Sequence, residues 1–286
     1  MDDLSDVSLI IKTFERRAAL ERLLDSIRAQ GYGDCPVLVA DDSNPPYRDA
    51  ILRAYGDVVD QYVVLPHDSG VSKGRNELLK RVDTEYFVVN DDDFVYDGRT
   101  DLRWLRTHLE AGDLDILGGL VFEPRHPSLP GWTAPVARCK ALVRRLLESR
   151  GEIPRDWRGE IQRDGDTLRL TKSNDWSPPW VSCEFTLQFF LARTDSVWAR
   201  VGGWAEELKS FGEHWEFFYR AKRAGLDVGF TREVGVRHVP LSNPEYSEHR
   251  FDREDRDMQK ALALHDLDVI EFHRPDGVRR VVRPSA

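Results

Sequence analysis

Cysteine is scarce in this sequence, with three residues in a chain of 286: Cys35, Cys139 and Cys183. Their spacing matches none of the short patterns by which cysteines bind zinc, and an odd number cannot all pair in disulfides. A few scattered thiols are typical of a reducing compartment. We therefore expect a cytoplasmic protein whose fold depends on neither disulfides nor cysteine-bound metal.

Long apolar runs and an excess of positive charge are also missing. The first apolar run, Val7–Ile11, is far shorter than the roughly 18 residues that span a bilayer, and the residues before it are acidic, unlike the start of a signal peptide. The sequence thus predicts no transmembrane segment and no signal peptide. The formal net charge is −9, which argues against nucleic acid or an anionic membrane as a nonspecific partner.

Two common phosphate-binding loops are absent. The segment Lys12–Glu15, which follows the first predicted strand, contains no glycine and so lacks the Rossmann fingerprint. The glycine-containing segment Gly70–Asn76 has no Gly-Lys-[Ser/Thr] at P-loop spacing. The same lack of glycines in the first loop disfavours a nucleotidyltransferase, which needs a flexible basic loop at that place.

What the sequence does contain is a regular alternation of strand-like and helix-like segments. Thr13 is a predicted N-cap for the first helix, which continues to about Gly31. This β–α alternation with short connections predicts an α/β fold with a mostly parallel central sheet and helices on both faces. The predicted strands are Val7–Ile11, Pro36–Ala40, Gln61–Leu65, Tyr86–Val89, Leu114–Val121, Val181–Leu191, Leu226–Phe230 and Val234–Val239.

The regular pattern stops twice along the chain. Residues 123–180 read as an insertion over the sheet edge, with a possible basic helix at Arg138–Arg150 and a hairpin at Gly159–Leu170. We expect residues 1–244 to form the main domain and residues 245–286 a C-terminal extension. A helix near Arg253–Leu264 and a final hairpin are predicted in that extension, which could mediate a homodimer.

Three adjacent carboxylates, Asp91, Asp92 and Asp93, follow the predicted strand Tyr86–Val89 directly. Like charges so close repel one another unless a cation is near. Mg²⁺ and Mn²⁺ take oxygen ligands, commonly one or two carboxylates plus nucleotide phosphates, and open α/β sheets bind ligands at the carboxyl ends of strands. The triplet therefore predicts a metal–diphosphate site; a solvated aspartate turn is the alternative.

Further polar residues follow other elements. Asp41 and Asp42 end the second strand, where they can accept hydrogen bonds from a nucleotide or simply form an Asx turn. The loop at Gly70 opens a helix whose N-terminal amides favour anions, and Arg75 can face a phosphate or the acidic cluster. His238 ends a late strand and is a candidate third metal ligand, although a lone histidine is more often structural.

A pair of carboxylates, Glu213 and Glu216, begins a helix after Gly212. Residues three apart share one helix face, and the positive end of the helix dipole favours their charged form. Either can act as a general base for an acceptor hydroxyl. The alternative is an ordinary capped helix whose aromatic face is core.

Taken in order, the motifs are Asp-Asp-Ser, Gly-x-Ser-x-Gly-Arg-Asn, Asp-Asp-Asp, Gly-Gly-Trp, Gly-Glu-x-x-Glu and a final His. This order resembles a GT-A glycosyltransferase of the inverting family-2 type. Some stretches are similar to the β-1,4-N-acetylgalactosaminyltransferase group, the GM2/GD2 synthase type: Gly70–Asn76, Asp91–Val95, Phe189–Asp195 and His214–Phe218. The resemblance covers roughly residues 6 to 240.

The resemblance implies a binding site for a UDP-sugar. Asp42 would hold the uridine, with Thr13 and Arg16 lining the same pocket, and Arg75 would lie beside the nucleotide. In the aspartate triplet, Asp91 or Asp92 would contact the ribose. Asp93 would bind Mn²⁺ or Mg²⁺, and His238 stands where such folds often place a further metal ligand.

The resemblance also implies a reaction and a base. The family's usual base is the aspartate of a Glu-Asp pair, and here that pair reads Glu213-His214. We predict Glu213 as the base, with Glu216 second and His214 third. The implied activity is metal-dependent inverting transfer of GalNAc, or another hexose or N-acetylhexosamine, from a UDP-sugar to a hydroxyl of a saccharide or other acceptor. A non-catalytic nucleotide-sugar-binding module and a sugar-phosphate nucleotidyltransferase are the alternatives.

Overall fold

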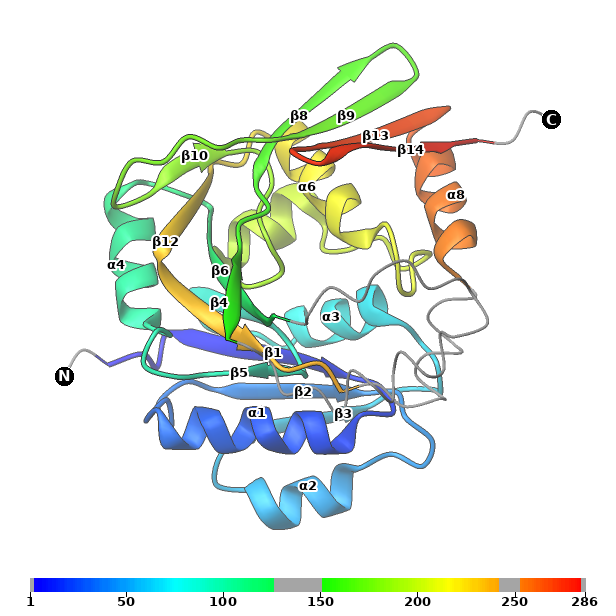
Figure 1. Ribbon diagram of the computed structural model, residues 1–286. Coiled ribbons are helices and arrows are strands. Elements are labelled where there is room, and N and C mark those ends of the chain that lie inside the picture. The colour runs from blue at the N-terminus through cyan, green and yellow to red at the C-terminus, as the bar shows by residue number, and fades with distance from the viewer. Residues whose placement is uncertain (1–2, 126–150, 242–252, 284–286) are drawn as a thin grey trace.

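The larger of two β-sheets forms the centre of the protein in the computed structural model, which describes residues 3–125, 151–241 and 253–283 (Figure 1). Two short strands extend this sheet outside the main strand order: β5 (Phe94–Val95) pairs with β12, and β7 (Glu152–Arg155) pairs with β6. Across the sheet the order is β10 (Val181–Cys183), β12 (Val228–His238), β6 (Ile116–Pro124), β11 (Phe190–Arg193), β4 (Tyr86–Asp91), β1 (Val7–Thr13), β2 (Val37–Asp41) and β3 (Gln61–Val64).

The strands that carry the predicted site residues run parallel. β4, β1, β2 and β3 pair in parallel, and so do β6 and β12, whereas β11 lies antiparallel between β4 and β6. The register aligns Lys12 with Asp91 and Thr13 with Asp41. The carboxyl ends of β1, β2 and β4 therefore meet at one edge of the sheet, as the sequence predicts.

Helices cover both faces of the sheet (Figure 1). On β1, Leu9 and Ile11 pack into the core shared with α1 (Arg17–Ala29), whereas Ile10 packs into the core on the other face. This alternation of buried side chains follows from the two-residue period of a strand. Helices α2 (Arg48–Tyr55) and α4 (Leu102–Ala111) share the first core, and the second core includes α3 (Val71–Leu79), α6 (Glu213–Arg223) and α8 (Glu254–Leu264).

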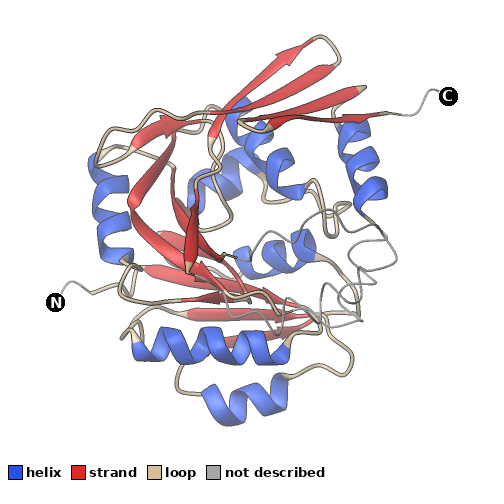
Figure 2. Cartoon of the chain, viewed as in Figure 1, coloured by secondary structure: helices blue, strands red, loops and turns tan. Residues whose placement is uncertain are grey.

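A second, four-stranded sheet is visible beside the larger one (Figure 2). It joins two segments that are far apart in the sequence, as the colours of Figure 1 show. Its order is β14 (Gly277–Val282), β13 (Val269–Arg274), β9 (Thr167–Lys172) and β8 (Gly159–Asp164). Both predicted hairpins are present, and β13 pairs in parallel with β9. The expected insertion and C-terminal extension thus share one sheet, while the domain boundaries themselves stay a prediction.

Two strand predictions were wrong. The run Val181–Leu191 is two separate strands, because β10 pairs with β12 whereas β11 lies between β4 and β6. The two late strands are one, β12, whose register to β6 shifts between Phe230 and Gly235; this irregularity accommodates the polar residues that suggested a break. A short π-helix, η2 (Ser196–Val201), follows β11. The predicted basic helix Arg138–Arg150 lies outside the described residues.

No helix in the described ranges has both the length and the apolar character needed to cross a membrane.

Candidate active site

A pocket opens where β1, β2 and β4 end and α3 and α6 begin. Eight of the residues singled out in the sequence line it: Arg16, Asp42, Gly70, Arg75, Asp91, Asp93, Glu213 and His238. They come from segments spread over most of the chain, so the fold rather than the local sequence brings them together. Thr13, Asp41, Asp92, His214 and Glu216 are not among the lining residues.

The three carboxylates of the triplet each have a cationic partner. Asp91 accepts a hydrogen bond of 2.9 Å from Arg75 Nη2. The guanidinium of Arg16 contacts both Asp92 and Asp93, with 2.5 Å between Nη1 and Asp93 Oδ2. His238 Nε2 lies 3.2 Å from the same Asp93 oxygen. The repulsion within the triplet is therefore offset by side chains of the protein itself, mainly by Arg16.

These contacts shift the pKa values of the buried groups. Burial raises the pKa of Asp92, against the opposing effect of Arg16. Burial also acts to raise the pKa of Asp93, but hydrogen bonds with His238 and Arg16 outweigh it and lower that pKa. Burial acts to lower the pKa of His238, but the carboxylates of Asp93 and Glu123 outweigh it and raise that pKa to about 9. Asp93 is thus held as a carboxylate facing the pocket.

The two aspartates at the end of β2 have different surroundings. Asp42 faces the pocket, and its oxygens accept hydrogen bonds from Lys12 Nζ at 2.5 Å and from Gly70 N at 2.9 Å. Asp41 is fully buried and accepts from the backbone of Tyr47 at 2.7 Å and the hydroxyl of Tyr62 at 2.8 Å. The other oxygen of Asp41 accepts the N–H of Ser43, two residues on, at 2.9 Å, which agrees with the Asx-turn alternative.

Thr13 has a different structural role from the one predicted. It is the last residue of β1, and its hydroxyl donates a 2.7 Å hydrogen bond to Asp92 Oδ2. The N-cap of α1 is Arg16, and no side chain caps this helix end. The N-cap prediction was thus wrong, because β1 runs two residues beyond the apolar run Val7–Ile11 and carries Thr13 into the sheet.

Arg75 is one of the cationic residues that line the pocket. It is the middle residue of α3, and its side chain is only 3% exposed. Besides its bond to Asp91, it has Nη1 at 3.9 Å from Glu213 Oε1 and its guanidinium carbon at 5.5 Å from the ring of Trp204. The position of this cation is therefore fixed between the end of β4 and the start of α6.

The three base candidates of α6 point in different directions. Glu213, at the first position of the helix, lines the pocket. His214 turns to the carbonyl of Thr186, with Nε2 at 2.5 Å from the oxygen, and burial lowers its pKa to about 3. Glu216 is buried and lies 2.9 Å from Nε2 of His265. Of the three, Glu213 alone is placed to meet a ligand in the pocket.

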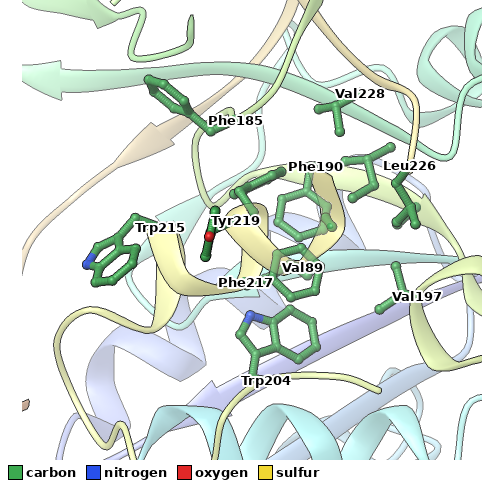
Figure 3. Packing of buried hydrophobic residues seen from close by; sticks show 14 of the residues in the cluster. Val89, Phe185, Phe190, Val197, Trp204, Trp215, Phe217, Tyr219, Leu226 and Val228 are labelled. Carbon is green, nitrogen blue, oxygen red and sulfur yellow. The ribbon is translucent and has the colours of Figure 1, made fainter. Parts of the chain in front are cut away.

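The aromatic face of α6 fixes this helix to the sheet (Figure 3). The ring of Phe217 stacks on Trp204 at 4.8 Å between centroids and on Phe190 of β11 at 6.0 Å. All three residues are buried. Stacked aromatic contacts of this kind restrict how the helix can move, and they hold Glu213 at the pocket edge.

Sequence reasoning missed several polar groups of the pocket. Lys12 precedes Thr13 at the end of a strand, and this position was the one feature of the sequence that could have indicated its place in the pocket. Lys209 and Arg253 follow no strand and belong to no motif, so only tertiary packing reveals them. The missed polar lining residues are Lys12, Asp68, Arg155, Gln188, Lys209, Ser210 and Arg253.

Known proteins are similar to this chain in sequence and in fold. The family described as "Glycosyl transferase family 2" matches residues 8–161. "Beta-1,4 N-acetylgalactosaminyltransferase 1" of Homo sapiens is 33% identical over 233 residues, which cover 82% of this chain and 39% of that protein. The chain thus spans well under half of this curated relative.

Two solved structures are similar in fold at low sequence identity. "S. aureus TarS 1-349 in complex with UDP" has a TM-score of 0.54 and 17% identity, over 90% of this chain and 64% of that one. "GalNAc-T7 with UDP, GalNAc and Mn2+" has a TM-score of 0.57 and 13% identity, over 82% and 44%. They show a GT-A fold, as the sequence predicts. With the family match over more than half of its length, the chain belongs to glycosyl transferase family 2.

Proposed function

We propose that this chain moves a sugar from a UDP-sugar to a hydroxyl of a saccharide or other acceptor, with inversion and with a divalent metal. The observation that carries this proposal is the convergence of Asp42, Asp93 and Glu213 on one pocket. The name of the human relative supports GalNAc as the sugar, and a structural neighbour solved with UDP supports a uridine nucleotide. Family membership favours sugar transfer over nucleotidyl transfer.

The residues at the pocket fit a metal that shares its ligands with the substrate. Asp93 Oδ2 and His238 Nε2 lie 3.2 Å apart and both residues line the pocket, so a metal bound between them would displace the proton that His238 shares with Asp93. Within the described parts of the chain, no group of three or more acidic, histidine or cysteine side chains could hold a metal alone. Mn²⁺ or Mg²⁺ commonly takes its remaining ligands from phosphates and water. When bound, such an ion would neutralise charge on the diphosphate.

The side chains of the pocket have distinct roles in the proposed reaction. Asp42, fixed by Lys12, would accept a hydrogen bond from the uridine, and Arg75 would face the leaving diphosphate. Glu213 would take the proton from the acceptor hydroxyl as the new carbon–oxygen bond forms and the bond to the diphosphate breaks. One displacement at the anomeric carbon inverts it, and a single working carboxylate suffices because the leaving diphosphate needs no proton.

A screen of UDP-sugars by UDP release tests this proposal. The wild-type chain is compared with Asp93→Ala, Glu213→Ala and Glu216→Gln in the presence of Mn²⁺. We expect turnover with UDP-GalNAc, a loss of about 10²- to 10⁴-fold in kcat for Glu213→Ala, and a change of severalfold at most for Glu216→Gln. Equal turnover in all four proteins would show that Asp93 and Glu213 have no part in the active site. UDP binding without any release or transfer of sugar would favour the non-catalytic module.

A further inference from the structure

One face of α8 lies against a wall of the pocket. Residues four apart on a helix share a face, and the side chains on this face of α8 and its two flanking residues reach three separate parts of the site. Those residues are Arg253, Asp257, Ala261 and His265. The helix comes from the C-terminal segment, for which the sequence offered no function beyond possible dimer formation.

The central contact on this face is made by Asp257. Its side chain is buried, at 1% exposure, and Oδ2 accepts a 3.0 Å hydrogen bond from the backbone N–H of Ser210. A hydrogen bond to a carboxylate is stronger than one between neutral groups. Lys260 Nζ lies 3.4 Å from the other oxygen of Asp257 and donates to the carbonyl of Glu207 at 3.3 Å. Two residues of α8 therefore hold the segment that leads to Ser210.

The two flanking residues of the helix reach further groups of the site. At the N-terminal end, the guanidinium of Arg253 makes two contacts with the carboxylate of Asp68, and both residues line the pocket. At the C-terminal end, His265 lies 2.9 Å from Glu216 on α6. The helix thus contacts the loop before α3, the segment before α6, and α6 itself.

The segment from Leu208 to Gly212 lies between α8 and the start of α3. On the α3 side, Val71 N donates to the carbonyl of Lys209 at 2.8 Å, and the Ser72 hydroxyl donates to that of Leu208 at 2.6 Å. On the α8 side, a Cβ at Gly212 would lie 3.1 Å from Ala261 Cβ. Residue 213, the base candidate, follows directly, so contacts on both sides determine where its carboxylate stands.

We propose that Asp257 is a positioning residue for the reaction, given that the pocket has the transferase function proposed above. By accepting the Ser210 N–H, it fixes the segment that carries Lys209 and Glu213 into the pocket. Asp257 itself does not line the pocket. Loss of this hydrogen bond removes the shorter of the two hydrogen bonds from α8, so that the α3 contacts and the longer Lys260 bond to Glu207 hold the backbone of the segment. Small displacements of a catalytic group have large effects on rate.

The test compares Asp257→Ala with Asp257→Asn, which keeps an oxygen acceptor for the Ser210 N–H. In Asp257→Ala, amide hydrogen exchange within residues 208–216 should rise by about tenfold or more. The kcat for sugar transfer should fall by about tenfold to a hundredfold, while the Kd for UDP changes by less than about threefold. Asp257→Asn should retain slow exchange and most of the kcat.

Asp255→Ala is the matched control, because Asp255 is exposed on the same helix. It should behave as wild type in both measurements. The proposal would be overturned if Asp257→Ala showed the same amide hydrogen exchange over residues 208–216 as the wild type, or the same kcat. If the alanine variant does not fold, Asp257→Ser provides the same comparison with Asp257→Asn. A wild-type chain that transfers no sugar refutes the proposed function, and the exchange measurement then still decides whether Asp257 holds the segment.

Discussion

The ammonium group of Lys12 lies 2.5 Å from Oδ1 of Asp42, and both residues are buried. The other Asp42 oxygen accepts the Gly70 N–H, so the carboxylate is held from two sides. The aliphatic part of Lys12 passes over Gly74 of α3, where there is no room for a Cβ. The glycine, the lysine and the aspartate therefore form one packed unit at the end of β2.

Replacing Lys12 should weaken nucleotide binding through its effect on Asp42. In Lys12→Met the buried carboxylate loses its counter-charge and keeps only the Gly70 N–H of the two contacts, so its orientation toward a ligand is less well fixed. We expect about tenfold weaker binding of UDP and, equally, of uridine, because the effect arises at the nucleoside end of the pocket. Isothermal titration calorimetry with the two ligands measures both affinities.

The control for this prediction is Lys80→Met. Lys80 is exposed at the end of α3 and pairs with Glu77 on the surface, so its loss should leave both affinities unchanged. If Lys12→Met weakens UDP but not uridine, Lys12 acts on the phosphates and not through Asp42.

Gly70→Ala should destabilise the fold and displace the loop before α3. Gly70 has φ of 95°, and a Cβ there would lie 2.7 Å from Cα of Lys209. Since backbone cannot move aside as a side-chain end can, we expect a loss of about 2 to 4 kcal/mol in the free energy of unfolding, and weaker UDP binding. Urea denaturation measures the first effect.

Gly33→Ala is the control, because its Cβ would meet nothing within 4 Å and φ there is not positive. Equal effects of the two changes would contradict this explanation.

The sequence predicted those residues of the site whose place in the fold follows directly from a local pattern. Parallel strands that end in polar residues place those residues at one sheet edge, and this is how Asp42 and Asp93 come to share a pocket. Local pattern could not tell which of two adjacent aspartates faces the ligand. Neighbouring side chains at a strand end point to opposite sides, so Asp41 is buried in its loop whereas Asp42 lines the pocket.

Two other features could not be read from the sequence at all. The first is that Arg16, expected beside the uridine, reaches across to bind Asp92 and Asp93. The second is the contribution of the C-terminal segment, because Arg253 enters the pocket only through the packing of α8. Both depend on contacts between segments far apart in the chain, which no periodicity or motif reports.

Removing the metal, or one of its predicted ligands, should weaken diphosphate binding more than nucleoside binding. Asp93 and His238 are the side chains that would hold the ion, and its remaining ligands would be phosphate oxygens. We expect Mn²⁺ to tighten UDP binding to the wild-type chain and EDTA to reverse this effect. In His238→Ala the gain from Mn²⁺ should shrink by about tenfold or more, while uridine affinity stays the same.

Calorimetry of UDP and uridine with and without Mn²⁺ measures these differences. Lys209→Met is a useful comparison, because Lys209 lines the same pocket but has no metal-binding group. It should lower UDP affinity by a similar factor with and without the metal. If UDP binds the wild-type chain equally well in Mn²⁺ and in EDTA, Asp93 and His238 are not metal ligands for this nucleotide.

Glu216 should stabilise the protein at neutral pH and not in acid. Burial acts to raise the pKa of Glu216, but hydrogen bonds with His265 and Arg220 lower it below the ordinary value of 4.5. The ionised form is therefore favoured in the folded state, and its stabilisation is present above pH 4.5 and lost as pH falls through the lowered pKa. Glu216→Gln should reduce the free energy of unfolding by about 2 kcal/mol at pH 7, and the difference from wild type should shrink below pH 4.5.

Urea denaturation across this pH range measures the effect, with Glu21→Gln on the surface of α1 as control. A difference in the free energy of unfolding that does not change with pH would show that the charge of Glu216 is not its source.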